Sequence, residues 1–472
     1  MSLSRTGGLA VLLAATVALG GCSTIRGIGD RLNPFNDEDK AAESVATEGK
    51  RISIIEFAPK VEATEGLKGQ DFYLPPAAPI AEWPLPGGTP EQSVEHVQAA
   101  QNLQIAWRRG FGEGSDNDTH VIAPPVMANG RVFVMDGRSA VSAMDAGSGA
   151  VVWRVELPAR GKRDRHAFGG GLAYADGKLY VSSGNRYLAQ LDAATGAINW
   201  KRDTASPLHA APTVSGGKVF VVSTDNEMLA FNAATGAEDW NYQALVEPAR
   251  LLRASSPAVS GDTLVGAFAS GEVIAFRAAN GNDLWNQALS QANRTNALSE
   301  IRDIAGRPVI YKGDVYAGSH SGVFAAIDLR TGQPRWSLPV ASITTPWAAG
   351  DVVFFVSQAG EVICASRESG QVYWIRDLNA NWKDQGVSKG FGIGSFRIGG
   401  GNAKIRPLWS SPILASDRLL VASSTGRLVA LNPKTGETLS TLEIGEPVLL
   451  SPIAANGTVY LATDEANLIA IR

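Results

Sequence analysis

The sequence contains few of the residues that build reactive or metal-binding sites. It has 2 cysteines among 472 residues, Cys22 and Cys364, so it holds neither a pair of adjacent cysteines nor the Cys-x-x-Cys-His motif that attaches haem. Its 5 histidines are scattered, and no two lie at the spacing typical of metal ligands. We therefore expect no cofactor, no metal ion and no catalytic residues.

Charge and hydrophobicity exclude two further classes of protein. The net charge of −4 at pH 7 provides no basic surface for binding nucleic acid. No apolar run reaches the roughly 18 residues that a membrane-spanning helix needs. With 44% hydrophobic and 19% charged residues, the composition is that of a globular protein with a substantial core.

Residues 1–21 have the pattern of a bacterial signal peptide. Arg5 precedes an apolar stretch that is too short to span a membrane, and Leu19-Gly20-Gly21-Cys22 follows it. These residues resemble a lipobox, in which Cys22 becomes the acylated first residue; the alternative is ordinary cleavage at a small-residue site. Ser23, where an inner-membrane lipoprotein usually has Asp, resembles outer-membrane lipoproteins. We therefore predict a protein anchored to the periplasmic side of the outer membrane by acyl chains such as palmitate.

The segment that follows, residues 22–102, has a different composition. Residues 37–44 are polar, and residues 75–88 are rich in proline. Both compositions disfavour regular secondary structure. We predict a lipidated, flexible tether that continues as an extended segment along the wall of the folded domain.

A repeated pattern dominates the rest of the chain. A tight turn with Gly or Asp is followed nineteen residues later by a Gly, and four residues after that by a Trp. The turns lie at Gly130, Gly177, Gly217, Asp262, Gly313, Asp351, Asp417 and Gly457, and the Trp residues at Trp153, Trp200, Trp240, Trp285, Trp336 and Trp374. A period of about 40 to 50 residues is typical of propeller blades, and one Trp at a fixed place in each unit indicates packing between blades rather than ligand stacking.

Each repeat reads as four short strands, and the two ends of the chain complement each other. The eighth unit stops at Arg472 after three strands, whereas residues 103–109 have the pattern of a fourth strand with no unit of its own. We infer that this strand completes the last blade, because closure removes exposed strand edges. The predicted fold is all-β: residues 103–472 form an eight-bladed β-propeller with four-stranded antiparallel blades, and an N-terminal strand closes the ring.

The turns of such a propeller fall on two faces. Turns between first and second strands and between third and fourth strands share the hairpin face. Turns between second and third strands and the connections between blades share the connection face. Because the connections vary in length, with an insertion at about 379–406, and recognition usually resides in loops on a rigid scaffold, we expect partners to bind the connection face.

The repeats resemble the propellers of dehydrogenases that depend on pyrroloquinoline quinone (PQQ). In those enzymes the quinone stacks on a Trp opposite a disulfide between adjacent cysteines, next to a calcium ion. This chain lacks the adjacent cysteines, so the cofactor site would be missing one wall. We therefore predict that the protein is not an enzyme, and we retain a PQQ-dependent quinoprotein dehydrogenase and a polysaccharide-binding periplasmic propeller as alternatives.

The lipobox and the repeats together closely resemble the BamB family, lipoprotein subunits of the outer-membrane β-barrel assembly machinery (the BAM complex). The resemblance covers the lipobox and about residues 100–472. In that family a Leu-x-Leu-Arg loop between the third and fourth blades, and an Asp-x-Asp loop between the fourth and fifth, contact a POTRA domain of the barrel-forming subunit BamA. The residues that match these loops are Arg250, Leu251, Leu252, Arg253 and Asp303, with Arg250 in place of the first Leu and Ala305 in place of the second Asp.

The resemblance implies a non-enzymatic scaffold that assists the folding and insertion of outer-membrane β-barrel proteins. Its implied partners are the POTRA domains of BamA, the BAM complex and unfolded outer-membrane proteins. Leu251 and Leu252 have an alternative interpretation as core residues at the start of a strand, because exposed apolar residues are informative only in clusters.

Overall fold

The computed structural model describes residues 61–472 except for 101, 158–167, 247–254, 290–301 and 381–405. The chain divides into two units, Met1–Ala58 and Pro59–Arg472, and every described residue belongs to the second. Within the described ranges, no helix combines the length and the apolar character that crossing a membrane would require.

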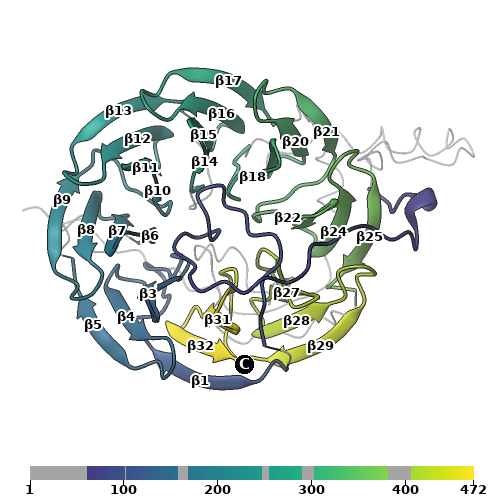
Figure 1. The fold of residues 1–472 in the computed structure, drawn as a ribbon, viewed down its shortest axis with the longest axis horizontal. Coiled ribbons are helices and arrows are strands. Elements are labelled where there is room, and N and C mark those ends of the chain that lie inside the picture. Colours follow the sequence, from purple (N-terminus) through teal and green to yellow (C-terminus); the bar gives the residue numbers. More distant parts are fainter. Residues whose placement is uncertain (1–60, 101, 158–167, 247–254, 290–301, 381–405) are drawn as a thin grey trace, which may run out of the picture. The chain divides into compact units, whose positions relative to one another are not determined.

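Eight four-stranded antiparallel sheets form a ring of blades around a central axis (Figure 1). Blade 1 contains β2 (Val126–Ala128), β3 (Arg131–Met135), β4 (Val141–Asp145) and β5 (Val151–Val155). Blade 2 contains β6 (Gly170–Ala175), β7 (Lys178–Ser183), β8 (Tyr187–Asp192) and β9 (Ile198–Asp203). Blade 3 contains β10 (Thr213–Ser215), β11 (Lys218–Val222), β12 (Glu227–Asn232) and β13 (Glu238–Gln243). Blade 4 contains β14 (Ala258–Ser260), β15 (Thr263–Ala267), β16 (Glu272–Arg277) and β17 (Asp283–Ala288).

The remaining blades repeat this order, with the first strand innermost. Blade 5 contains β18 (Val309–Tyr311), β19 (Asp314–Gly318), β20 (Phe324–Asp328) and β21 (Pro334–Leu338). Blade 6 contains β22 (Trp347–Ala349), β23 (Val352–Val356), β24 (Glu361–Ser366) and β25 (Val372–Asp377). Blade 7 contains β26 (Ile413–Ala415), β27 (Arg418–Ala422), β28 (Arg427–Leu431) and β29 (Thr438–Glu443). Blade 8 contains β30 (Ile453–Ala455), β31 (Thr458–Ala462), β32 (Asn467–Ile471) and, from the other end of the chain, β1 (Ile105–Gly110).

The pairing of β1 with β32 closes the ring. The two strands are antiparallel, with Arg109 opposite Leu468, and the outer strand is held further by Arg108, whose guanidinium donates to Glu446 Oε1 (2.5 Å) and to the Ile444 carbonyl (2.5 Å). With β1 in place, blade 8 has four strands like the other blades, and the edge of β32 is covered. The predicted eight-bladed, N-terminally closed propeller is confirmed.

Burial along each strand follows from its position in the blade. The middle strands lie between neighbouring blades and are apolar on both faces, as in β23, where every residue is buried. The outer strands alternate between exposed and half-buried residues, as in β13, because only one face packs against the next blade. The hydrophobic core is therefore a set of clusters in and between blades rather than one central mass.

The repeated Trp and Gly residues interlock neighbouring blades. Trp240 Nε1 donates to the Ala278 carbonyl of the next blade (3.1 Å). Its ring packs on Gly281, which has φ +76° and where a Cβ would lie 2.5 Å from the ring. The same donation to the next blade is made by Trp153, Trp200, Trp285, Trp336 and Trp374. The interpretation of the Trp series as packing between blades is confirmed.

Candidate functional site

The predicted partner site lies where the connections leave blades 3 and 4. Arg250, Leu251, Leu252 and Arg253 are outside the described residues. The described residues that precede them, Leu245 and Val246, follow β13 and have exposed fractions of 64% and 67%. These two neighbouring exposed aliphatic side chains form a small apolar patch at the start of the connection, and they extend the candidate site beyond the residues identified from the sequence.

Asp303, the second predicted contact, is buried, with an exposed fraction of 2%. Its carbonyl accepts a hydrogen bond from the backbone N–H of His320 (2.9 Å), and the next residue, Ile304, lies in the core. Its neighbour Arg302 is exposed. In this structure Asp303 therefore supports the shape of the connection, and Arg302 presents its side chain to solvent.

The structure brings the two predicted connections together. Ser255, two residues after Arg253, donates from its hydroxyl to the carbonyl of Gly306, three residues after Asp303 (3.1 Å). Gly306 has no room for a side chain there, since a Cβ would lie 2.4 Å from the Thr344 carbonyl. The sequence contains no local signal for this hydrogen bond, because it joins two connections that are far apart in the chain. Sequence reasoning also missed Leu245 and Val246, because these residues lie between the repeat pattern and the stretch that matches the family motif.

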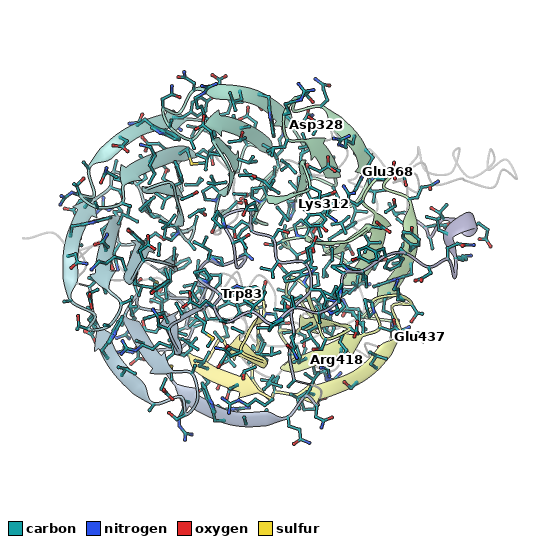
Figure 2. The ribbon with its side chains drawn as sticks, viewed as in Figure 1. Trp83, Lys312, Asp328, Glu368, Arg418 and Glu437 are labelled. Atoms are coloured by element: carbon teal, nitrogen blue, oxygen red, sulfur yellow. The ribbon has the colours of Figure 1, made fainter. Side chains whose placement is uncertain are left out.

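The hairpin face is covered by residues 61–100, which we call the strap. Its first part pairs with the outer wall of blade 6, where Thr64 N–H donates to the Val372 carbonyl (2.8 Å). The rest then crosses the middle of the ring, drawn in purple in Figure 1. The prediction that this segment lies along the wall is therefore wrong beyond its first residues. The innermost strands offer it free edges for backbone hydrogen bonds, and apolar side chains of the strap are buried over the middle of the ring, where Trp83 lies (Figure 2).

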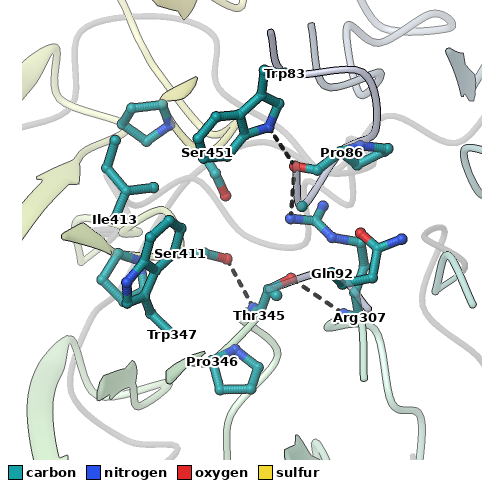
Figure 3. Close-up of a pocket in the computed structure, with 13 residues that line it drawn as sticks. Trp83, Pro86, Gln92, Arg307, Thr345, Pro346, Trp347, Ser411, Ile413 and Ser451 are labelled. Carbon is teal, nitrogen blue, oxygen red and sulfur yellow. Dashed lines mark hydrogen bonds between the residues drawn. The ribbon is translucent and has the colours of Figure 1, made fainter. Parts of the chain in front are cut away.

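The strap fills the axial end of the channel. Trp83 and Trp347 stack with ring centroids 6.3 Å apart, and the Pro86 carbonyl accepts hydrogen bonds from Trp83 Nε1 (3.3 Å) and Arg307 Nη2 (3.3 Å) (Figure 3). A hydrogen bond from Thr345 N–H to Ser411 Oγ (2.8 Å) joins blades 6 and 7 beside them. The cavity among these residues has a volume of about 10 Å³, about what one water molecule requires.

This channel does not fit a quinone cofactor with its metal ion. Among the residues that the structure describes, no three His, Cys, Asp or Glu side chains are gathered as metal ligands. Cys364 is buried in β24, and burial raises the pKa of its thiol well above the ordinary value, which keeps it protonated and unreactive. The residues that the structure describes thus provide neither the disulfide wall nor a set of metal ligands for such a cofactor.

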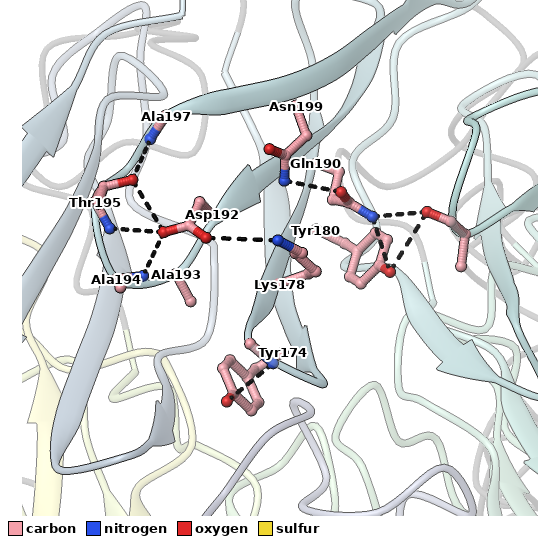
Figure 4. Close-up of polar contacts among 12 residues, drawn as sticks. Tyr174, Lys178, Tyr180, Gln190, Asp192, Ala193, Ala194, Thr195, Ala197 and Asn199 are labelled. Atoms are coloured by element: carbon pink, nitrogen blue, oxygen red, sulfur yellow. Dashed lines mark hydrogen bonds and ion pairs between the residues drawn. The ribbon is translucent and has the colours of Figure 1, made fainter.

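Three carboxylates with a lowered pKa, Asp145, Asp192 and Asp328, belong to the turns between third and fourth strands. In the turn between β8 and β9, Asp192 accepts hydrogen bonds from Thr195 Oγ1 (2.9 Å) and Thr195 N–H (3.0 Å). These hydrogen bonds lower the pKa of the Asp192 carboxyl (Figure 4). Nearby, Gln190 Nε2 donates to Tyr180 Oη (3.1 Å) and to the Ala233 carbonyl of blade 3 (2.7 Å). Hydrogen bonds within turns and between blades thus account for the polar groups at this place.

Comparison with known proteins gives the family and the fold. A family model described as Outer membrane protein assembly factor BamB matches residues 91–165, 137–376 and 392–472. The chain is 26% identical over 187 residues to the BamB of Salmonella typhimurium, and 24% identical over 187 residues to that of Escherichia coli; each match covers 39% of this chain and 41% of the relative. The chain thus spans about two fifths of the length of these relatives.

Solved structures share the propeller fold. The crystal structure of BamB from Moraxella catarrhalis matches with a TM-score of 0.63 at 20% identity, covering 79% of this chain and 100% of that one. A europium-containing methanol dehydrogenase matches with a TM-score of 0.62 at 14% identity, covering 81% of this chain and 89% of that one. At these identities the likeness establishes the fold alone, whereas the family model covers more than half of the chain. This chain therefore belongs to the family of the outer membrane protein assembly factor BamB.

Proposed function

We propose that this chain is a non-enzymatic scaffold lipoprotein that assists the folding and insertion of outer-membrane β-barrel proteins by docking to a POTRA domain of BamA within the BAM complex. Family membership supports the role in assembly. The observation that carries the docking surface is the hydrogen bond from Ser255 to Gly306, because it joins the two connections that resemble the BamA-binding loops of the family.

The chemistry of this surface suits a protein partner. Leu245 and Val246 provide exposed apolar area at one end of the first connection, and Arg253 follows in the same connection. Arg302, next to Asp303 in the second connection, has an exposed side chain. Interface hot spots are enriched in Arg and are surrounded by apolar contacts that exclude water, so this combination supports docking.

Acylation at Cys22 would hold the scaffold at the periplasmic side of the outer membrane, where β-barrels are inserted. Both this anchor and unfolded outer-membrane proteins as further partners belong to the proposal. A quinoprotein dehydrogenase is the alternative suggested by the fold, but the strap-filled channel and the single buried Cys364 disfavour it. No particular observation favours a polysaccharide ligand.

The experiment that tests the docking surface is titration of the full chain with a purified POTRA domain of BamA. We expect Arg253→Glu combined with Leu252→Ala to weaken binding by at least about 1 to 2 kcal/mol, or about 5- to 30-fold, because a desolvated contact is lost and a repulsive charge is gained. Circular dichroism and the melting temperature should not change.

Arg330→Glu is the matched control. Arg330 is an exposed arginine in the turn between β20 and β21, on the hairpin face, and we expect its charge reversal to leave POTRA binding unchanged. Equal binding by wild type and by the Arg253 variant would refute the docking surface. Failure of the wild-type chain to copurify with any POTRA-containing barrel, together with a quinone absorbance, would instead favour the enzyme.

A further inference from the structure

The strap contacts every blade of the propeller. It extends over residues 61–100, and no other segment of the described chain crosses the ring in this way (Figure 1). The hydrogen bonds, from blade 1 to blade 8, are Met127 N to Trp83 O (2.8 Å), Tyr174 N to Pro84 O (2.7 Å), Gln92 Nε2 to Thr213 Oγ1 (3.2 Å), Val259 N to Pro90 O (2.8 Å), Ile310 N to Glu91 O (2.9 Å), Asp351 N to Tyr73 O (3.1 Å), Val97 N to Leu414 O (3.1 Å) and Asn456 N to Ile80 O (2.7 Å).

Several of these bonds satisfy the free edges of the innermost strands. Met127 and Val259 are the central residues of β2 and β14, and each pairs with its own blade on one side only. Their N–H groups on the axial side donate to strap carbonyls. In a propeller without such a segment these edges would remain open to water or to another extended chain.

The strap satisfies these edges without creating a new one. Pro84 and Pro90 accept hydrogen bonds from β6 and β14 through their carbonyls, but proline has no N–H to offer to a further strand. Other prolines in the strap restrict it to extended conformations, which lowers the entropy lost on binding. The remaining prolines are Pro75, Pro76, Pro79 and Pro86.

Apolar side chains anchor the strap at three places. Phe72 and Trp83 are buried in the core cluster that blades 6, 7, 8 and 1 share, and Leu85 is buried in the cluster between blades 2 and 3. Val97 is buried against β26, with which it pairs in parallel. Burial of one such side chain contributes about 1.5 to 3 kcal/mol, so these residues account for most of the affinity.

Charge complements this packing. The strap carries Asp71 and Glu95, which pair with Lys434 (2.5 Å) and Lys312 (3.7 Å) on the turns of blades 7 and 5. The ammonium of Lys434 also lies 4.4 Å from the centre of the Phe72 ring. Exposed ion pairs of this kind contribute little energy, and their effect is to fix where along the strap each blade binds.

We propose that the hairpin face is a peptide-binding groove, that the strap is its resident ligand, and that the strap keeps the innermost strand edges from pairing with other polypeptides. The ligand chemistry is an extended, acidic, proline-rich peptide. Residues 61–90 lie outside the ranges matched by the family model, so the inference concerns a feature of this chain and does not depend on the proposed docking to BamA.

Cleavage between the strap and β1 tests the proposal in the full chain. A protease site inserted at residues 101–102 would leave the strap attached by non-covalent contacts alone. We expect the cleaved wild-type strap to coelute with the propeller in gel filtration. Trp83→Ala with Val97→Asp should release the cleaved strap at least about a hundredfold faster, because loss of a buried Trp alone typically costs more than the about 2.8 kcal/mol that corresponds to this factor.

Gln98→Ala is the matched control, since Gln98 is exposed beside Val97 and its backbone bond to Ala78 is retained (2.8 Å). It should coelute like wild type. Release of the wild-type strap as fast as that of the double variant, with the ring still folded, would overturn the proposal. Coelution as a dimer would assign the groove to the strap of a second copy and would overturn the assignment to the same chain.

Amide hydrogen exchange gives a second measurement that needs no variant to fold. In the uncleaved wild-type chain, the amides of Met127, Tyr174, Val259 and Ile310 should be as protected as those of the middle strands, because the strap accepts their hydrogen bonds. Exchange at the rate of exposed strand edges would contradict a resident ligand.

Discussion

At the scale of single residues, the smallest repeated contact is one Trp on one Gly of the next blade. The sequence spacing identified both residues and predicted packing between blades for the Trp. The positive φ of the Gly, +76° at Gly281, is one reason for a glycine there. The structure adds a second reason: the Trp ring of the preceding blade leaves no room for a side chain on the Gly, as at Gly281 next to Trp240. A spacing rule cannot supply this second reason, because the contact joins two repeats.

A comparison of two glycines separates the cost of backbone strain from the cost of a clash with the Trp ring. Gly281 and Gly177 have nearly the same φ, +76° and +75°, but a Cβ at Gly281 would lie 2.5 Å from Trp240 whereas one at Gly177 would meet nothing within 4 Å. We expect Gly177→Ala to cost about 1 kcal/mol from backbone strain, and Gly281→Ala to cost about 1 to 3 kcal/mol more from overpacking. Chemical denaturation measures both values, and equal losses would show that the ring contact contributes nothing.

The turn carboxylates predict how stability depends on pH. Asp145 accepts hydrogen bonds from Ser148 Oγ (2.7 Å) and Ser148 N–H (2.8 Å), which lower the pKa of its carboxyl below the model-compound value of 3.8. When folding lowers the pKa of a carboxyl, the ionised carboxyl stabilises the fold at pH values above its pKa in the unfolded chain. This stabilisation is lost as the pH falls through its pKa in the folded chain. Asp145 should therefore stabilise the fold at neutral pH and lose that effect below about pH 4.

Asp145→Asn removes this titration while keeping the acceptor oxygen. The corresponding residue of blade 3 is Asn232, whose Oδ1 accepts from Thr235 N–H (3.0 Å), so an amide is compatible with the turn. We expect the melting temperature of the variant to fall less steeply than that of wild type between about pH 4 and pH 2. Parallel curves over that range would contradict a role for the Asp145 charge.

At the scale of elements, the two ends of the chain differed in how far they could be predicted. The strand at residues 103–109 was predicted because its pattern matched the one strand that the eighth repeat lacked, and β1 does pair with β32. The course of the strap was not predicted, because its partners are turns and edges of all eight blades and leave no periodic pattern in its own sequence. Proline content indicated only that it is extended.

Deletion of residues 103–110 tests closure at this scale. It removes β1, exposes the edge of β32, and should lower the melting temperature sharply and promote aggregation, because an open propeller end pairs readily with other chains. Deletion of residues 23–45, which lie outside the described residues, should leave the melting temperature nearly unchanged. Calorimetry with light scattering compares the two, and equal melting temperatures would refute closure by β1.

At the scale of the whole molecule, the two faces of the propeller differ. The hairpin face is occupied by the strap, whereas the connection face carries the joined connections at Ser255 and Gly306. The sequence predicted which face varies, because loop length is visible in the repeats. It could not predict that Asp303 is buried or that Leu245 and Val246 are exposed, because burial in a connection depends on neighbouring blades.

The proposed acyl anchor would determine where this two-faced molecule works, and Cys22 is the residue whose substitution tests it. Cys22→Ser removes the thiol that would receive the acyl chains, so we expect unprocessed or mislocalised precursor instead of protein in the outer-membrane fraction. Replacing residues 1–22 by a cleavable signal without a lipobox should release the propeller into the soluble periplasm, since acylation at Cys22 is the membrane attachment that we propose. Fractionation and mass spectrometry of the mature N-terminus measure both outcomes. Wild-type protein found in the soluble periplasm without acyl chains would exclude a lipoprotein, while the propeller, its strap and its connection face would stand as described.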